Sequence, residues 1–179
     1  INDKGYLTDR LTEEAVAFID RNKSRPFLLY LAYNAVHAPP QAPRETIESV
    51  RRRFPGLSEK RVTLMAMLKH LDDGVGSVVA KLRKERLFKN TLVFFLTDNG
   101  GSRAMTANNA PLRGFKGSLF EGGIRTPMIV SWPEKFGGGR YIATLTIRFK
   151  PYEIRRLLQS AGIPFAEAVS RPAVVLPIY

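Results

Sequence analysis

The sequence predicts an α/β fold, with a mostly parallel sheet flanked by helices. Short apolar runs at residues 27–33 and 92–97 alternate with longer segments in which apolar residues recur at helical spacing. A continuous apolar run is typical of a parallel strand buried on both faces. Alternating strands and helices favour a parallel sheet. With 179 residues, 44% of them hydrophobic, the chain can form one domain with a sizeable core.

The first part of the chain predicts a helix, a strand and an irregular loop. Residues 7–22 place apolar side chains on one helical face, and Thr8 or Thr12 could cap that helix. Residues 27–33 then predict a buried strand. Residues 34–43 contain three prolines, so we expect a stiff, irregular loop there.

Two helices are expected next. Residues 44–53 predict a short basic helix, and Ser58 is placed to cap a long helix that runs to about Arg86. Gly74 and Gly76 would weaken that helix by about 1 kcal/mol each relative to alanine. We therefore expect both glycines to allow close packing against a neighbouring element.

The remainder of the chain predicts strands separated by a long loop. Residues 92–97 and 127–132 predict strands, and residues 102–123 form a polar, glycine-rich segment without periodicity. A loop of that length inside a compact domain is usually functional. Residues 141–147 predict an edge strand, and residues 152–160 predict a helix after a glycine turn. No internal repeat or domain boundary is visible, so we expect a single domain.

The charge balance favours anionic partners. The chain has 28 basic and 16 acidic residues, a net charge of +12, which suits sulfate or phosphate esters, acidic glycans or nucleic acid. Nucleic acid is the weakest of these, because the basic residues are dispersed and no recognised binding motif accompanies them. The run from Arg51 to Arg53 predicts a solvated helix face.

Composition excludes several other classes. The chain has no cysteine, which excludes disulfides, thiolate metal sites and a cysteine nucleophile within it. No apolar run is long enough to span a bilayer, and the first residues lack the apolar centre of a signal peptide. The chain does not begin with methionine, so we expect a processed or cut piece of a larger protein.

The segment after the strand at residues 92–97 is the strongest candidate site. Ligands in open α/β sheets bind beyond the carboxyl ends of the strands, where Asp98 and Asn99 follow. Both side chains offer oxygen ligands, which suit a hard cation such as Ca²⁺ or Mg²⁺. Gly100 and Gly101 let the backbone turn sharply beside them.

Two further side chains could bind an anion, and each has a structural alternative. His37 follows a predicted strand and could donate to an anionic oxygen or act as an acid, or it could bond only to nearby backbone. Lys116 lies between glycines and could stabilise charge on an ester oxygen, or it could be a solvated surface lysine. For Glu121 and Arg125 we favour a structural salt bridge. The glycines between them argue against a helix, so we do not expect an ordinary ion pair along one helix.

The paired carboxylates Asp72 and Asp73 lie within the predicted long helix. Adjacent residues on a helix do not face each other, so a solvated face is favoured over a metal site.

Taken together, several segments resemble the type I sulfatases of the alkaline phosphatase superfamily. The resembling segments are residues 26–34 with His37-Ala-Pro39, residues 71–76, residues 97–101 and residues 111–127, in the order found in that family. The resemblance covers roughly residues 5–135, and residues 136–179 diverge. It implies an alkaline phosphatase-like fold that is incomplete at its N-terminus, corresponding to the later part of the catalytic domain.

The resemblance also implies roles for the matching residues. Asp98 and Asn99 would be ligands of a divalent cation, usually Ca²⁺ in the family. Lys116 would contact the sulfate ester, and His37 would bind the sulfate and help to protonate the leaving oxygen. The implied partner is a sulfated small molecule or glycan rather than nucleic acid, and the implied location is exported, periplasmic or lysosomal.

One departure from the family limits what this chain could do alone. Sulfatases use a formylglycine made within a Cys/Ser-x-Pro-x-Arg motif, and the chain contains no such motif. We therefore expect a fragment of a sulfate monoester hydrolase, acting on aryl or sugar esters when intact and inactive by itself. The alternatives are a phosphomonoester or phosphonate ester hydrolase of the same superfamily, and a non-catalytic anion- or glycan-binding module.

Overall fold

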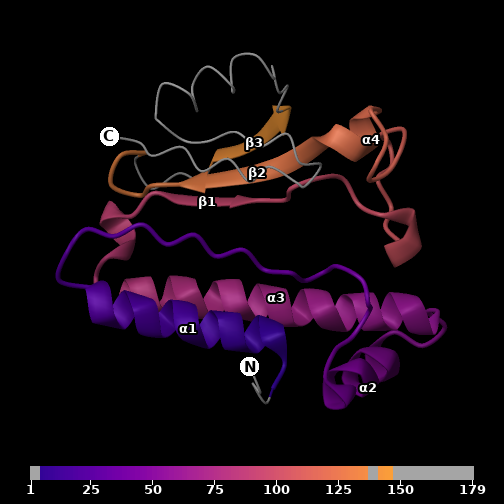
Figure 1. The fold of residues 1–179 in the computed structure, drawn as a ribbon, viewed down its shortest axis with the longest axis horizontal. Helices are drawn as coiled ribbons and strands as arrows, with labels where there is room; N and C mark the ends of the chain where they lie inside the picture. The colour runs from indigo at the N-terminus through magenta and orange to yellow at the C-terminus, as the bar shows by residue number, and fades with distance from the viewer. Residues whose placement is uncertain (1–4, 137–140, 147–179) are drawn as a thin grey trace, which may run out of the picture. The chain divides into compact units, whose positions relative to one another are not determined.

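The computed structural model describes residues 5–136 and 141–146 (Figure 1). The chain divides into two units, residues 1–146 and 147–179, and every described element belongs to the first. The predicted turn at residues 137–139 and the predicted helix at residues 152–160 lie outside the described residues.

The described residues form a group of helices followed by a small sheet. The helical predictions are confirmed, except that the longest helix ends at Lys84 rather than near Arg86. None of the described helices is both long enough and apolar enough to cross a membrane. The elements are α1 (Leu7–Asn22), α2 (Arg44–Arg53), α3 (Glu59–Lys84), η1 (Phe88–Asn90), β1 (Val93–Leu96), η2 (Arg103–Met105), α4 (Glu121–Ile124), β2 (Arg125–Ser131) and β3 (Tyr141–Thr146).

One predicted helix cap is confirmed and the other is wrong. Ser58 caps α3, because its side-chain oxygen accepts from the backbone N–H of Arg61 at 3.4 Å. The N-cap of α1 is Tyr6, which makes no side-chain capping bond. Thr8 and Thr12 are buried inside α1, and the Thr12 hydroxyl donates to the carbonyl of Thr8 at 2.9 Å. A threonine inside a helix satisfies its hydroxyl in this way, one turn back.

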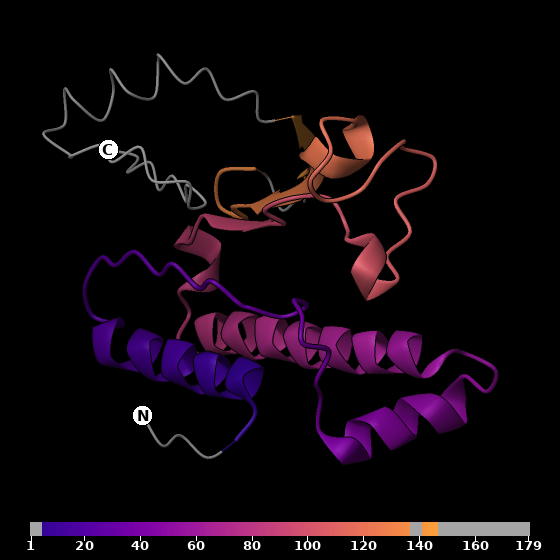
Figure 2. The same cartoon turned by 45° about the vertical axis from the view of Figure 1, so that its right-hand side comes forward.

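Helices α1 and α3 lie side by side, in both views of the fold (Figures 1 and 2). A Cβ on Gly74 of α3 would lie 2.5 Å from the Thr12 hydroxyl oxygen and 2.7 Å from that of Tyr33. The expectation of close packing is therefore confirmed at Gly74. It is wrong at Gly76, around which no atom lies within 4 Å.

The segment at residues 27–33 is not the buried strand that we predicted. Its exposure alternates along the chain, with Leu28 70% and Tyr30 63% exposed. The other side packs on the helices, where Phe27 meets Phe18 edge to face and the Tyr33 hydroxyl bonds Thr12. A strand needs a neighbouring edge for its backbone groups, and no described strand pairs with this segment.

The sheet has the order β1-β2-β3, and both of its pairs are antiparallel. The mostly parallel pairing that we predicted is thus wrong for the described strands. Val93 pairs with Ser131 and Leu96 with Met128. The chain reverses direction between successive strands, and only a crossover connection of the βαβ kind would have made neighbouring strands parallel. The edge position predicted for residues 141–147 is confirmed for β3.

Burial of the strand after α3 was also predicted wrongly. β1 is an end strand of the described sheet, and its Phe94 side chain is 48% exposed. Phe95 and Leu96 are exposed as well. The apolar run thus indicated a strand correctly, but its covering partner is not among the described elements.

Candidate active site

The turn that follows β1 carries the two predicted metal ligands. Asp98 is exposed and Asn99 is half-buried. The Asn99 side-chain nitrogen donates to the carbonyl of Gly100 at 3.0 Å. This bond uses the side-chain nitrogen of Asn99, and no described residue donates to its side-chain oxygen.

Asn109 ties this turn to the lysine-bearing loop. Its side-chain nitrogen donates to the carbonyls of Gly101 and Gly114, at 3.0 and 3.1 Å. Its side-chain oxygen accepts from the backbone N–H of Gly101 at 3.1 Å. Sequence reasoning missed Asn109, because nothing in a polar loop marks one asparagine as a structural clamp.

Lys116 is attached to the same turn through its backbone. Its N–H donates to the carbonyl of Gly101 at 3.1 Å. The structure therefore brings Lys116 close in space to the segment that carries Asp98 and Asn99.

Glycines make this crossing of two backbones possible. The N–H of Gly100 donates to the carbonyl of Gly123 at 2.9 Å, and the N–H of Gly122 donates to that of Arg113 at 2.7 Å. A Cβ on Gly100 would collide with the carbonyl oxygen of Gly122, and a Cβ on Gly122 with that of Gly114. Both crossings therefore require a residue without a side chain.

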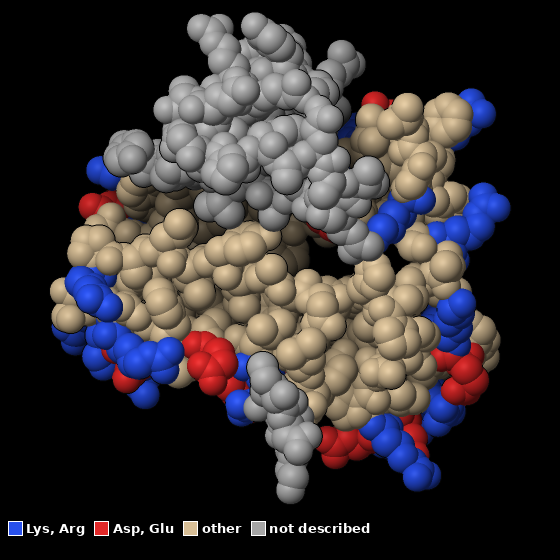
Figure 3. Space-filling view, viewed as in Figure 1, with Lys and Arg blue, Asp and Glu red and all other residues tan. Residues whose placement is uncertain are grey.

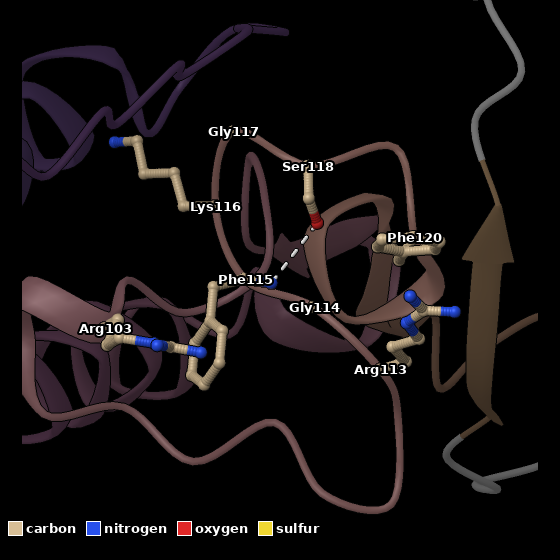
Figure 4. A pocket seen from close by; sticks show the side chains of 8 residues that line it. All are labelled: Arg103, Arg113, Gly114, Phe115, Lys116, Gly117, Ser118 and Phe120. Atoms are coloured by element: carbon tan, nitrogen blue, oxygen red, sulfur yellow. Dashed lines mark hydrogen bonds between the residues drawn. The ribbon is translucent and has the colours of Figure 1, made fainter.

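Lys116 lines an open hollow of about 450 Å³ (Figure 4). The Arg103 guanidinium lies 4.6 Å from the ring centre of Phe115, and that of Arg113 lies 3.9 Å from the ring centre of Phe120. We call this site the basic hollow. It is lined by Arg103, Arg113, Gly114, Phe115, Lys116, Gly117, Ser118 and Phe120.

His37 lies in a different hollow, of about 230 Å³, together with Tyr6, Asn34 and Met67. Its side chain is exposed, and Nδ1 lies 2.9 Å from the carbonyl oxygen of Ala38. That contact is the structural alternative considered above. The described residues do not bring His37 into the basic hollow, so its role in binding sulfate stays a prediction.

The charged residues that we interpreted as structural form ion pairs or lie exposed on helices. Arg125 lies 3.7 Å from the Glu121 carboxylate, which confirms a salt bridge. The expectation that glycines exclude a helix there is wrong, because the pair spans the single turn of α4. Asp73 pairs with Lys69 at 2.6 Å on an exposed face of α3. Residues 51–53 are exposed at the end of α2.

An oxygen-bearing turn at the end of a strand, bonded to a loop that presents a lysine, is an arrangement suited to a metal-dependent hydrolase of anionic esters. The sulfatase family model matches residues 1–147. The chain therefore belongs to the sulfatase family. Its fold is part of the alkaline phosphatase-like α/β fold of the similar solved sulfatases.

Individual relatives agree with this membership. The chain is 35% identical over 142 residues to the uncharacterized sulfatase YdeN of Escherichia coli, covering 77% of this chain and 25% of that protein. It is 34% identical over 172 residues to mouse steryl-sulfatase, covering 90% of this chain and 26% of the relative. The chain thus spans about a quarter of the length of the curated relatives that it matches.

Solved structures are similar as well. The crystal structure of Ps i-CgsB in complex with k-i-k-neocarrahexaose matches with a TM-score of 0.69 and 44% identity. The match covers 75% of this chain and 30% of that chain.

Proposed function

We propose that the intact enzyme containing this chain hydrolyses sulfate monoesters of aryl or sugar groups. The observation that carries the proposal is the bond from the Lys116 N–H to Gly101, which holds the lysine beside the turn of Asp98 and Asn99. A sulfate ester gains negative charge on its oxygens in the transition state. A lysine ammonium group and a cation can stabilise that charge together.

The side-chain oxygens of Asp98 and Asn99 can supply only part of a binding site for a divalent cation. Asp98 and Asn99 offer two oxygens, whereas Ca²⁺ takes six to eight. Among the described residues, no group of three or more His, Asp or Glu side chains could hold a metal ion. We propose that Asp98 and Asn99 supply part of a Ca²⁺ site and that other segments of the intact enzyme complete it. The cation would supply positive charge to the ester oxygens.

Lys116 and His37 would act on the ester itself. The flexible stem of Lys116 lets its ammonium group reach a sulfate oxygen from the loop. An imidazole such as that of His37 can donate a proton to a leaving oxygen near neutral pH. Because the two side chains line different hollows, this role for His37 requires the rest of the enzyme to bring a substrate between them.

Sugar esters are favoured over aryl esters as substrates. One similar structure was solved in complex with k-i-k-neocarrahexaose, an oligosaccharide. One similar mouse protein is named N-acetylgalactosamine-6-sulfatase, and it is 36% identical over 141 residues. The location that the family resemblance implied, exported, periplasmic or lysosomal, stays a prediction.

A non-catalytic anion-binding module is the second candidate, favoured by the unpaired cations of the basic hollow. Binding of a sulfated oligosaccharide that persists in Asp98→Ala and under chelation, without sulfate release, would support it. A phosphate-ester hydrolase of the same superfamily is distinguished by the relative rates on 4-nitrophenyl sulfate and 4-nitrophenyl phosphate.

The test of the proposal is sulfate release by the intact enzyme with Ca²⁺ present. We expect Lys116→Ala to lower kcat/KM by about 100-fold or more, the usual cost of removing a transition-state donor. Lys84→Ala is the control, because Lys84 lies on an exposed part of α3 and should leave the rate unchanged. Equal rates for the two variants would contradict the proposal.

The 179-residue chain alone should release no sulfate, since it has no Cys/Ser-x-Pro-x-Arg motif to supply the nucleophile. The purified chain with 4-nitrophenyl sulfate and Ca²⁺ tests this expectation. Activity well above that of its own Lys116→Ala variant would show that the fragment interpretation is wrong.

A further inference from the structure

We propose that the basic hollow binds a second anionic group of the substrate, next to the ester that is cleaved, and that Arg103 and Arg113 determine this specificity. The inference rests on the proposed function and narrows its substrate to a glycan that carries more than one anion. Of the three cations of the hollow, Lys116 would bind the ester that is cleaved, and the two arginines would bind the neighbouring anionic group.

Among the described residues, the cations of the basic hollow have no carboxylate partners. Within the described part of the chain, Arg103, Arg113 and Lys116 form no salt bridge and no side-chain hydrogen bond. Other arginines are paired, as Arg51 is with Glu59 at 2.6 Å and Arg44 with Glu48 at 2.8 Å. Unpaired cations gathered around one hollow create a positive potential that attracts anions.

Both guanidiniums of the hollow lie close to aromatic rings, at cation–π distance. Arg113 lies 3.9 Å from the centre of the Phe120 ring and Arg103 lies 4.6 Å from that of Phe115. This cation–π contact leaves the N–H edges of both arginines without a hydrogen bond to any described residue. Those edges form a planar fork that matches sulfate and carboxylate groups. Because stacking orders the side chain beforehand, less entropy is lost when an anion binds.

The spacing of the cations favours an extended ligand. Figure 4 shows Arg103 and Arg113 on opposite sides of Phe115, with the Lys116 side chain pointing away from both. An oligosaccharide with an anion on successive sugars could place one at the lysine and another at an arginine.

The distribution of charge on the molecular surface supports binding of an anionic group near the loop region. Figure 3 shows Lys and Arg side chains over the region of α4, whereas acidic and basic side chains alternate along the edge formed by the helices. The helical edge is thus close to electrically balanced. The loop region presents positive charge to a ligand.

Kinetics on two substrates of the intact enzyme test the inference. 4-Nitrophenyl sulfate carries one anion, and a carrageenan oligosaccharide with at least two sulfates carries several. We expect Arg103→Gln and Arg113→Gln each to lower kcat/KM on the oligosaccharide about tenfold, the value of one charge-assisted hydrogen bond. The same variants should change kcat/KM on 4-nitrophenyl sulfate less than twofold. Equal losses on both substrates, or no loss on either, would overturn the inference.

Arg53→Gln is the matched control, because Arg53 also stacks on a phenylalanine, 5.5 Å from the ring centre of Phe54, at the exposed end of α2. It should leave both substrates unaffected.

Binding separates this inference from the proposed function. If the wild-type enzyme cleaves neither substrate, the proposed function fails, and calorimetric titration with the same oligosaccharide still decides the inference. About tenfold weaker binding in Arg103→Gln, but not in Arg53→Gln, supports it. Unchanged affinity in Arg103→Gln and Arg113→Gln overturns it.

Discussion

The helical region, α1 to α3, and the region from β1 to β2 satisfy their side chains in opposite ways. In the helices, Ile19 and Val62 are fully buried. Lys81 of α3 bridges Asp20 of α1 and Glu85, which directly follows α3. In the second region Phe94 is 48% exposed, and the cations of the basic hollow have no described carboxylate partner.

The difference teaches that the two regions face different surroundings. The helices satisfy most of their apolar and charged groups among themselves, so their structure can be explained from these residues alone. The strands and the site loop leave apolar faces and positive charges exposed. Apolar faces of this kind are usually covered by another element. A local excess of positive charge attracts anionic ligands.

The largest expected effect is the loss of core packing in the helices. Ile19→Ala should lower the free energy of unfolding by about 2–5 kcal/mol, because Ile19 is fully buried in α1. Leu28→Ala should change it by less than about 0.5 kcal/mol, because Leu28 is 70% exposed. Urea unfolding of the chain measures both values. A similar loss of unfolding free energy in Ile19→Ala and Leu28→Ala would contradict the contrast between a buried and an exposed side chain.

The next largest effects are expected at the two glycines of α3, which test how closely α1 and α3 pack. Gly74→Ala should lower the free energy of unfolding by about 1–3 kcal/mol, because the new methyl group would meet the hydroxyls of Thr12 and Tyr33. Gly76→Ala, with open space around it, should raise stability by up to about 1 kcal/mol through helix propensity. Thermal unfolding followed by circular dichroism distinguishes the two. A stabilising Gly74→Ala would show that α1 and α3 do not pack as described.

A smaller effect on stability is expected at the site. Asn109→Ala removes three hydrogen bonds between the turn and the lysine loop. The loss of stability should be about 1–2 kcal/mol, because part of this loop is solvated and water can replace the amide. Sulfate release by the intact enzyme should fall more steeply than stability does. Asn108→Ala, which removes only one bond, from the N–H of Ala110, is the control.

The smallest effect is the pH dependence of the contact between α1 and α3. Hydrogen bonds from Lys81 and Lys23 hold the pKa of Asp20 below its ordinary value of 3.8. The bond from Lys81 likewise lowers the pKa of Glu85 below 4.5. A lowered carboxylate pKa stabilises the fold above its ordinary value, and that contribution is lost as pH falls through the lowered value.

The melting temperature should therefore decrease slightly on acidification below about pH 4. The decrease should be smaller in Lys81→Met, in which Asp20 and Glu85 lose one of the two lysines that both contact, Lys23 being the other. An unchanged pH profile in that variant would show that the ion pairs do not couple the helices. The effect is small because Asp20 and Lys23 are exposed to solvent.

Much of the helical region could be predicted from the sequence, and less of the sheet. Apolar periodicity and the Ser58 cap are local signals, and they gave the bounds of α1 and α2 and the start of α3. Burial of residues 27–33 and of β1 depends on what covers them, which no local pattern encodes. The apolar runs were typical of strands between two layers, but the described neighbours lie on one side only.

Candidate site residues could be chosen from the sequence, but the bonds that join their segments could not. The position of Asp98 and Asn99 after a strand followed from the apolar run before them. The bond from Lys116 to Gly101 and the clamp of Asn109 join residues that are 5 to 15 positions apart. Such contacts depend on how a loop folds back, and neither composition nor spacing indicates it.

The account depends most on Asp98 and Lys116 acting within one site. A double-mutant cycle on kcat/KM for sulfate release by the intact enzyme tests this directly, with Asp98→Ala, Lys116→Ala and the double variant. We predict that each single substitution lowers kcat/KM by about 100-fold or more, and that the double variant is within about threefold of the slower single one. Losses that multiply fully in the double variant would contradict a shared site.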